Sequence, residues 1–447
     1  MPVITRRQFL AHCSATAIAS AIMSKPVNAV LATRRKANII FVLADDLGYG
    51  DLGCYGQKTI KTPYLDRMAR EGVRFTQCYA GSTVCAPSRC ALMVGQHTGH
   101  CTIRGNALVP LRTEDVTVAE VLKNAGYTTA LIGKWGLGEP GTTGTPNRKG
   151  FDYFFGYLNQ KHAHDYYTDH LWRNEEQVRI PPGTYSHDLF TKEAIDWIRG
   201  NADKPFFLYL AYTIPHANNE MADQGMQVPS DFPYSDKPWP QAQKNHAAMI
   251  TRLDRDIGRL INLLWELGIE ENTVMFFSSD NGPHREGGGD PDFFDSNGPL
   301  RGIKRDLYEG GIRVPMIVRW PGTIKPNRVS NHVWAFWDFL PTAAEIAAVR
   351  PPAGIDGISV LPELLGEKQK NHEYLYWEFH ERGFSQAVRF GWWKAIRLNK
   401  DKPVELYNLE SDIGETRDVA SDHPNLVKKA QHIMETARTP SEHWPGK

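Results

Sequence analysis

The sequence lacks an excess of either charge, a long apolar run beyond its first 32 residues, and internal repeats. Its 447 residues include 51 Lys+Arg and 51 Asp+Glu, so the formal net charge is zero. The chain therefore has no basic footprint for nucleic acid, and any bound anion must be held by a local cluster of charges. No stretch after the N-terminal segment is long and apolar enough for a membrane-spanning helix. Disorder, collagen and coiled coil are excluded as the dominant class.

Cysteine is also scarce, with six residues, and it is unevenly distributed. Cys13 falls in the N-terminal segment. The other five crowd into the first quarter of the chain, at Cys54, Cys78, Cys85, Cys90 and Cys101. An odd number cannot pair completely, so one of them is a candidate for special chemistry. The sequence leaves open whether the rest are buried thiols or disulfides.

What the chain does contain is typical of a globular protein with a sizeable core, at 41% apolar and 23% charged residues. Its length suits two domains, one of them large. Aromatic residues reach 11%, which is enough for a core and for an aromatic-rich pocket.

The N-terminus has the pattern of an export signal. Arg6 and Arg7 precede a weakly apolar run over residues 15–23, and small residues follow at 29–32. This order predicts a twin-arginine signal peptide over residues 1–32, which would send a folded protein to the periplasm or outside the cell. The alternative is a frayed amphipathic N-terminus.

Apolar runs alternate with helical patterns through the first 350 residues. Continuous apolar runs, typical of strands covered on both faces, occupy residues 37–44, 128–132, 206–212, 273–277 and 314–318. Helices are predicted over residues 117–125 and 245–267. The alternation predicts an α/β fold with a large, mainly parallel sheet sandwiched by helices, and a ligand site beyond the carboxyl ends of its strands.

The pattern changes after a turn-rich stretch at residues 351–357. Closely spaced strands are predicted beyond it at residues 374–379, 386–390, 392–397 and 404–407, with a helix over 423–436. We therefore expect a large domain over residues 33–350, a linker over 351–372, and a smaller C-terminal α+β domain with an antiparallel sheet over 373–447.

Carboxylates follow two of the predicted strands. Asp45 and Asp46 come directly after the first strand, and Asp280-Asn281 follows the strand over residues 273–277. Adjacent carboxylates repel each other and are stabilised by a hard cation, so these oxygens form a candidate site for Ca²⁺ or Mg²⁺. The alternative is ordinary turn chemistry, since Asp and Asn are common after strands.

Cys85 opens the segment Cys85-Ala86-Pro87-Ser88-Arg89. Pro87 suits the first position of a helix that residues 90–94 continue, so Cys85 is predicted just before the helix N-terminus. Such a place favours anions and developing negative charge, and Arg89 lies about one turn further on. On composition alone, Cys85 would be a buried structural thiol and Arg89 a surface cation.

Taken together, these residues resemble the type I sulfatase family of the alkaline-phosphatase-like superfamily, over nearly the whole chain from Asn38 onwards. The segment from Cys85 to Arg89, with Gly95 downstream, is a highly specific signature of that family. The further matching segments are Asp45-Asp46, Gly133-Lys134-Trp135, Pro215-His216, Asp280-Asn281-Gly282, Gly302-Ile303-Lys304 and residues 308–311.

The resemblance implies a sulfuric ester hydrolase that cleaves sulfate monoesters, of carbohydrates or of aryl alcohols. In that family a maturation enzyme oxidises the cysteine to formylglycine, and the hydrate of the formylglycine is the nucleophile. The resemblance also implies Ca²⁺, with Mg²⁺ as the second choice. Its expected ligands are Asp45, Asp46, Asp280, Asn281 and the modified Cys85.

The resemblance assigns the positively charged residues as well. Arg89, Lys134 and Lys304 would offset the charge of the carboxylates, and His216 or Lys304 would protonate the leaving group. Two alternatives stay open. One is a phosphoesterase of the same superfamily, and the other is a non-catalytic protein that binds sulfated glycans with Cys85 unmodified.

Three positions depart from the family pattern. Gly136 stands where many relatives have a histidine that bonds the formylglycine. Gln96 stands where an arginine often follows the glycine, and Val94 replaces a small polar residue or an arginine. None of these departures removes a predicted metal ligand or the nucleophile.

Two segments predicted as loops are candidates for recognising the rest of the substrate. One is the aromatic stretch from His162 to Arg173, and the other covers residues 284–290. We expect His164 or His162 to replace the histidine missing at position 136, and His284 to lie near the leaving group. The alternative is that these are ordinary surface loops.

Overall fold

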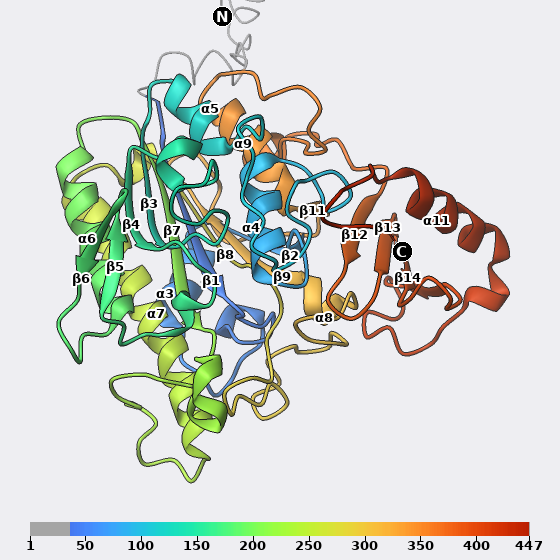
Figure 1. The fold of residues 1–447 in the computed structure, drawn as a ribbon, viewed down its shortest axis with the longest axis horizontal. Coiled ribbons are helices and arrows are strands. Elements are labelled where there is room, and N and C mark those ends of the chain that lie inside the picture. The colour runs from blue at the N-terminus through green and yellow to red at the C-terminus, as the bar shows by residue number, and fades with distance from the viewer. Residues whose placement is uncertain (1–35, 447) are drawn as a thin grey trace, which may run out of the picture. The chain divides into compact units, whose positions relative to one another are not determined.

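The computed structural model describes residues 36–446, so the predicted signal segment and Cys13 lie outside the described residues. Within residues 36–446 the chain forms an 11-stranded sheet and a separate 4-stranded antiparallel sheet. Figure 1 shows how these elements are arranged. This confirms the predicted fold class. No helix of the described chain has both the length and the apolar character needed to cross a membrane.

The centre of the large sheet is parallel and buried. Strand β1 (Asn38–Asp45) lies between β7 (Phe206–Pro215) and β8 (Thr273–Ser279), and β3 (Thr128–Lys134) pairs with the other side of β7. Every residue of β1 is buried, as expected for a strand covered on both faces. Four of the apolar runs predicted as strands therefore form the parallel middle of the sheet.

The flanks of the sheet include antiparallel pairs. Strand β9 (Arg313–Arg319), which the sequence predicted, runs antiparallel to β8 and to β2 (Val73–Tyr79). The remaining strands are β4 (Tyr153–Tyr157), β5 (His170–Arg173), β6 (Glu176–Arg179), β10 (Arg328–Ser330) and β11 (Trp334–Ala335). The prediction of a loop from residue 162 to 173 is therefore wrong at its end, because β5 pairs with both β4 and β6.

Helices cover both faces of the large sheet. On one face, Ile40 and Val42 of β1 pack in a core shared with α3 (Pro63–Arg70), α6 (Ser186–Asn201) and α7 (Gln241–Glu266). On the other face, the Phe41 ring contacts Phe339 of α9 (Phe339–Ile346), with ring centroids 4.6 Å apart. Alternate β1 residues therefore serve two separate apolar layers.

Both helices predicted in the first domain are present. Helix α5 (Val118–Asn124) begins with a capping box, in which Thr117 accepts from the Glu120 backbone and Glu120 accepts from that of Thr117. Helix α7 begins at Gln241, four residues before the predicted start. The short 3₁₀ helices are η1 (Gly53–Tyr55), η2 (Pro146–Lys149), η3 (His162–His164), η4 (Asn219–Gln224), η5 (Glu270–Asn272), η6 (Phe336–Asp338) and η7 (Ala420–Asp422).

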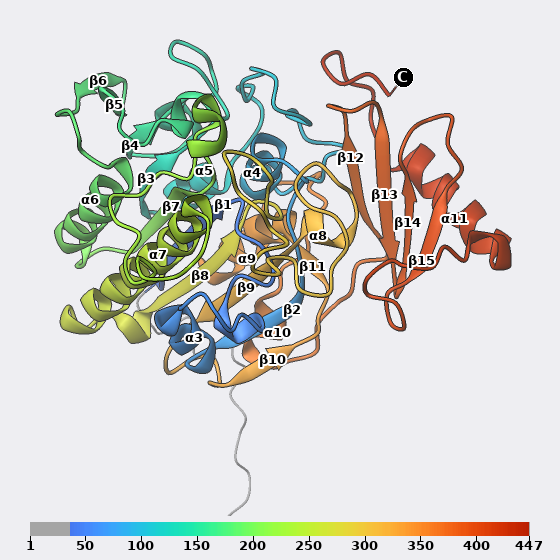
Figure 2. The same cartoon turned by 90° about the horizontal axis from the view of Figure 1, so that it is seen from below.

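The strands of the second sheet follow the predicted pattern closely, and Figure 2 shows them side by side. Its strands are β12 (Leu375–Phe379), β13 (Ser385–Phe390), β14 (Trp393–Arg397) and β15 (Glu405–Asn408). Helix α11 (Pro424–Thr436) packs on one face. The other face shares a core with Val84, Ala91 and Ile312, the last of these in α8 (Glu309–Ile312). The expected linker over residues 351–372 contains helix α10 (Leu361–Leu365).

The cysteines of the described chain are all free thiols, which settles the question that the sequence left open for this part of the protein. Four of the five are buried, and Cys54 is half-buried.

Candidate active site

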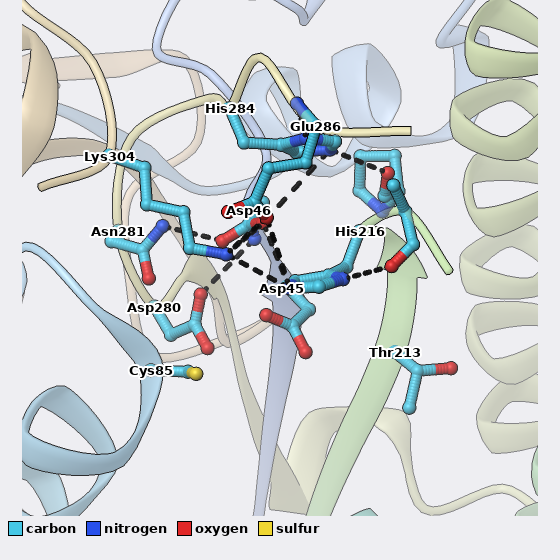
Figure 3. Close-up of polar contacts among 12 residues, drawn as sticks. Asp45, Asp46, Cys85, Thr213, His216, Asp280, Asn281, His284, Glu286 and Lys304 are labelled. Atoms are coloured by element: carbon cyan, nitrogen blue, oxygen red, sulfur yellow. Dashed lines mark hydrogen bonds and ion pairs between the residues drawn. The ribbon is translucent and has the colours of Figure 1, made fainter. Parts of the chain in front are cut away.

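Neighbouring strands of the large sheet bring the predicted polar residues to one edge. Asp45 ends β1, Lys134 ends β3, His216 follows β7, and Asp280 follows β8. Because these four strands are adjacent and mutually parallel, their carboxyl ends meet at the same edge. Figure 3 shows Cys85 reaching this cluster from a different element, helix α4 (Cys85–Val94).

The chain turns sharply where the two acidic segments meet. Asp46 has a φ of 65°, in the left-handed region that most residues avoid. Its backbone N–H donates to Asp280 Oδ1 at 3.1 Å, and its Oδ1 accepts from Asn281 Nδ2 at 2.7 Å. These bonds hold the turn after β1 against the turn after β8, so the carboxylates are placed by the backbone of two strands.

The oxygen atoms of this cluster fit a hard divalent cation. Ligand atoms of Asp45, Cys85 and Asp280 lie within 4.8 Å of one another. Asp45 Oδ1 and Asn281 Oδ1 are buried and have no hydrogen-bond partner in the described chain. A buried oxygen without a partner is costly, and carboxylate and amide oxygens are the ligands that Ca²⁺ prefers. The donor set therefore suits Ca²⁺ or Mg²⁺ better than a transition metal.

Two buried cations pair with these carboxylates. Arg89 donates to Asp280 Oδ2 through Nε at 3.0 Å and through Nη2 at 2.8 Å. Its Nη1 donates to the Lys134 backbone oxygen at 2.8 Å. Lys134 Nζ donates to Asp45 Oδ2 at 2.7 Å. The oxygens turned toward these cations are satisfied, whereas Asp45 Oδ1 is left free.

The electrostatic environment gives two of these carboxyl groups different pKa values. Burial alone would raise the pKa of Asp45, but Lys134 and Arg89 beside it lower that pKa to about 2. Burial and the negative charge of Asp45 raise the pKa of Asp280 to about 7, even though Arg89 opposes the shift. This like-charge repulsion is what a bound divalent cation would relieve.

Cys85 lies at the start of α4, not before it. The prediction that Pro87 opens the helix is wrong, because the helix begins at Cys85 and places Pro87 in its first turn. Proline is tolerated there, since the first four backbone N–H groups of a helix have no partner inside the helix. Burial raises the pKa of the Cys85 thiol although Lys134 opposes it, so the thiol is neutral.

His216 and Lys304 form a pair beside Asp46. Lys304 Nζ lies 2.8 Å from Asp46 Oδ2 and 2.9 Å from His216 Nε2. His216 Nδ1 lies 2.5 Å from the carbonyl oxygen of Ala217, which can only accept, so Nδ1 carries the hydrogen. His216 Nε2 is therefore an acceptor for Lys304. Burial and the charge of Lys304 lower the pKa of His216 well below its usual value.

The histidines predicted to contact substrate fall into two groups. His164 and His284 stack on His216, with ring centroids 4.3 Å and 5.5 Å away. His164 Nδ1 is buried without a partner, and burial together with Lys134 lowers the pKa of His164 to about 3. His162 instead lies 2.7 Å from Thr168 Oγ1 and is not part of this stack.

Two further residues contact the site: Glu286, predicted only as part of the substrate-recognition loop over residues 284–290, and Asn106, for which no role was predicted. Glu286 Oε2 accepts from Lys304 Nζ at 3.1 Å, and Glu286 Oε1 accepts from Arg305 at 2.5 Å. An acid in the loop that follows Asn281 was a usable signal for Glu286. Asn106 contacts Cys85, and no motif around Asn106 points to it.

Comparison with known proteins agrees with this geometry. A family model described as Sulfatase matches residues 37–349, and another described as N-sulphoglucosamine sulphohydrolase, C-terminal, matches residues 302–439. The chain is 30% identical to N-acetylgalactosamine-6-O-sulfatase of Bacteroides thetaiotaomicron, over 91% of this chain and 94% of that protein. It is 32% identical to N-acetylgalactosamine-6-sulfatase of Canis lupus familiaris, over 91% and 81% of the two chains.

Solved structures show the same fold. The structure of Ps i-CgsB in complex with k-i-k-neocarrahexaose has a TM-score of 0.82 and 29% identity, covering 92% of this chain and 95% of that one. A family model that spans most of the chain, relatives at 30% identity or more over nine-tenths of it, and a cluster of acids around a cysteine all agree. The chain therefore belongs to the sulfatase family, in the alkaline-phosphatase-like superfamily, and is a sulfuric ester hydrolase.

Proposed function

We propose that this sulfatase cleaves sulfate esters of carbohydrates, with a formylglycine made from Cys85 as the nucleophile and with Ca²⁺ bound beside it. The observation that carries this proposal is the pair of buried, unpartnered oxygens, Asp45 Oδ1 and Asn281 Oδ1, in the cluster that includes Cys85. Asp45, Asp46, Asp280, Asn281 and the modified residue 85 would hold the ion. When bound, Ca²⁺ would balance charge that develops on the sulfuryl oxygens.

The unmodified thiol of Cys85 suits neither the role of nucleophile nor that of a Ca²⁺ ligand. A neutral buried thiol is a weak nucleophile, and sulfur is a soft ligand that matches Ca²⁺ poorly. A formylglycine at position 85 would supply a hydrate oxygen both as the nucleophile and as a hard ligand. The proposal therefore requires a maturation enzyme that oxidises Cys85 in the producing cell.

The cationic side chains bind and orient the ester. Arg89 and Lys134 are buried, and their carboxylate partners hold them in fixed positions. A rigid cation in a site shielded from water stabilises the negative charge of a sulfuryl group more strongly than a mobile surface lysine does.

Lys304 is the source of the proton for the leaving oxygen. Although burial opposes it, the charges of Asp46 and Glu286 raise the pKa of Lys304 above its usual value, so the ammonium is fully protonated. His216 accepts a hydrogen bond from this ammonium and carries no proton on Nε2. We therefore assign leaving-group protonation to Lys304 and the orientation of its Nζ to His216.

The proposed leaving group is a sugar. The relatives at 30% and 32% identity are named for N-acetylgalactosamine 6-sulfate, and the solved structure at 29% identity is a complex with k-i-k-neocarrahexaose. In this chain, His164 and His284 flank His216 and offer ring faces and polar nitrogens next to the leaving-group side. Such a combination suits a ring that carries hydroxyl groups.

Export is the remaining part of the proposal. The twin-arginine pattern of the N-terminal segment supports transport of the folded protein to the periplasm or outside the cell. Fractionation of the natural host with N-terminal sequencing tests it. Mature protein outside the cytoplasm with an N-terminus near Thr33 supports export, and full-length protein in the cytoplasm rejects it.

The activity is tested with matched esters. Sulfate release from N-acetylgalactosamine 6-sulfate should exceed phosphate release from the 6-phosphate in kcat/KM, and Cys85→Ala should abolish it. An undiminished Cys85→Ala variant rejects the nucleophile. Faster cleavage of the phosphate ester would favour a phosphoesterase.

A further inference from the structure

The sulfur of Cys85 has a specific partner outside the acidic cluster. Cys85 Sγ donates to Asn106 Oδ1 at 3.7 Å, and the backbone N–H of Ala86 donates to the same oxygen at 3.2 Å. The residue before the helix, Val84, has no side-chain oxygen to cap it. Asn106 therefore supplies, from a separate loop, the acceptor that a Ser or Asp usually provides at a helix start.

The loop that carries Asn106 is held firmly by the C-terminal part of the chain. Arg104 Nη1 donates to Glu378 Oε1 at 3.0 Å and to the Thr439 carbonyl oxygen at 3.1 Å. Gly105 lies against the Trp444 ring so closely that a Cβ at this position would meet Cζ3 at 2.6 Å. The residue just before Asn106 therefore packs closely on the ring, with no room for a side chain there, and the loop is tied to the C-terminal part of the chain next to Asn106.

No side chain from position 136 competes with Asn106. A Cβ on Gly136 would meet the Gln160 side chain at 2.7 Å, and the φ of Gly136 is 78°. The space that a larger residue would need at position 136 is thus filled by Gln160, and Asn106 is the hydrogen-bond partner that the structure gives to Cys85.

We propose that Asn106 is a positioning residue that accepts a hydrogen bond from the side chain of residue 85 and favours its hydrated form. The inference rests on the proposed formylglycine. Formylglycine and water combine reversibly to a geminal diol, in which water adds across the C=O bond and leaves two O–H groups. The diol can donate to Asn106 Oδ1 as the thiol does, whereas the aldehyde has no O–H to donate.

Asn106 stabilises the diol relative to the aldehyde, because only the diol has an O–H group to donate. A hydrogen bond made only by the diol shifts the hydration equilibrium toward the form that carries the nucleophilic oxygen. The amide oxygen is not basic, so Asn106 orients the diol without removing its proton. A typical net hydrogen bond corresponds to a shift of about threefold to tenfold in this equilibrium.

The test measures the aldehyde directly, without substrate. Peptide mass spectrometry first establishes that residue 85 is formylglycine in the wild type and in each variant. The folded proteins are then treated with an aminooxy probe, which condenses with the aldehyde to an oxime and releases water. Asn106→Leu should be labelled about threefold to tenfold faster than the wild type, because its side chain has similar size but no acceptor.

Two variants control for charge and for loss of a helix cap. Asn106→Asp keeps the acceptor and should be labelled no faster than the wild type. Thr117→Ala loses the N-cap bond of α5 without touching residue 85, and it should match the wild type. Asn106→Ala provides the same comparison if the leucine variant does not fold.

The outcomes distinguish a failure of the role of Asn106 from a failure of the proposed formylglycine mechanism. Equal labelling of the wild type and Asn106→Leu overturns the role of Asn106, as does equal acceleration in the aspartate variant. A thiol at position 85 in active wild-type enzyme rejects the proposed function, and this inference with it. In the expected result, kcat on 4-nitrophenyl sulfate also falls in Asn106→Leu, while KM stays close to the wild-type value.

Discussion

Lys304 Nζ lies 2.9 Å from His216 Nε2, and the histidine is the acceptor in this contact. The two residues are 88 positions apart in the chain: His216 directly follows β7, and Lys304 lies in the long segment between β8 and α8. In the proposed function, the lysine of this pair supplies the proton and the histidine fixes the direction in which the ammonium points.

Replacing Lys304 should therefore affect substrates according to their leaving group. Lys304→Ala is expected to lower kcat/KM on a sugar sulfate by about 10²–10⁴-fold, the usual contribution of a general acid. The loss on 4-nitrophenyl sulfate should be much smaller, since nitrophenolate departs without a proton. Equal losses on both esters would contradict the assignment. Lys192→Ala, on an exposed lysine paired with Asp196, is the control.

Calcium should stabilise the folded protein through the acidic cluster. At a Ca²⁺ concentration of about 100 times Kd, the free energy of unfolding should rise by about 2.7 kcal/mol. Asn281→Ala removes one of the unpartnered oxygens and should shrink this gain, and a chelator should abolish both the gain and the activity. Thermal unfolding with and without Ca²⁺ measures it. An identical gain in Asn281→Ala would place the ion elsewhere.

Acid should destabilise the protein through His97. Burial lowers the pKa of His97 to about 4, against the opposing charge of Asp356. The unfolded chain thus binds more protons than the folded one between that pKa and the ordinary value of 6.5, so stability is full above this window and falls as pH falls through it. His97 should contribute a loss of about 2 kcal/mol between neutral pH and about pH 5.

The variant His97→Asn isolates this contribution. Its amide oxygen can accept the hydrogen bond that Gly99 N–H donates to His97 Nδ1, but it does not titrate. Denaturant unfolding at both pH values should show a smaller difference for the variant than for the wild type. The same pH dependence in both proteins would show that His97 is not responsible.

A buried lysine joins the second sheet to the segment next to the site. Lys394 Nζ lies 3.0 Å from Glu309 Oε1 and 2.9 Å from Glu415 Oε1, and all three side chains are fully buried. Lys394→Met would leave two carboxylates facing each other without a cation, so the free energy of unfolding should fall by about 3–5 kcal/mol. Lys428→Met, on an exposed lysine, should change stability by less than about 0.5 kcal/mol.

A double variant tests whether this loss of stability arises from repulsion between the two carboxylates. Adding Glu415→Gln to Lys394→Met removes one of the repelling charges, and part of the stability should return. If the destabilisation of the double variant equals the sum of the losses measured for Lys394→Met and Glu415→Gln alone, the three groups do not act as one network.

The sequence predicted the central strands and the acidic cluster because both follow from local patterns. Continuous apolar runs mark strands buried on two faces, and polar residues just beyond them must meet where parallel strands end together. Asp45, Lys134, His216 and Asp280 all obey this rule. The flanking strands β4 to β6 escaped prediction because they have only four or five residues each, and β6 in addition is mostly exposed and has no apolar run.

Contacts between distant loops could not be predicted, because they do not follow from a local sequence pattern. Asn106 contacts Cys85 from a loop in which Arg104 pairs with Glu378, a residue 274 positions away. His164 and His162 are two residues apart and looked equivalent in the sequence. The 3₁₀ turn over His162–His164 sends one ring to His216 and the other to Thr168.

Mass spectrometry of the peptide that contains residue 85, from purified and fully active enzyme, shows whether Cys85 is the source of the nucleophile. We expect a formylglycine, which is lighter than cysteine, in a fraction of molecules that rises in step with specific activity. Full activity from a preparation in which residue 85 is only a thiol would contradict it.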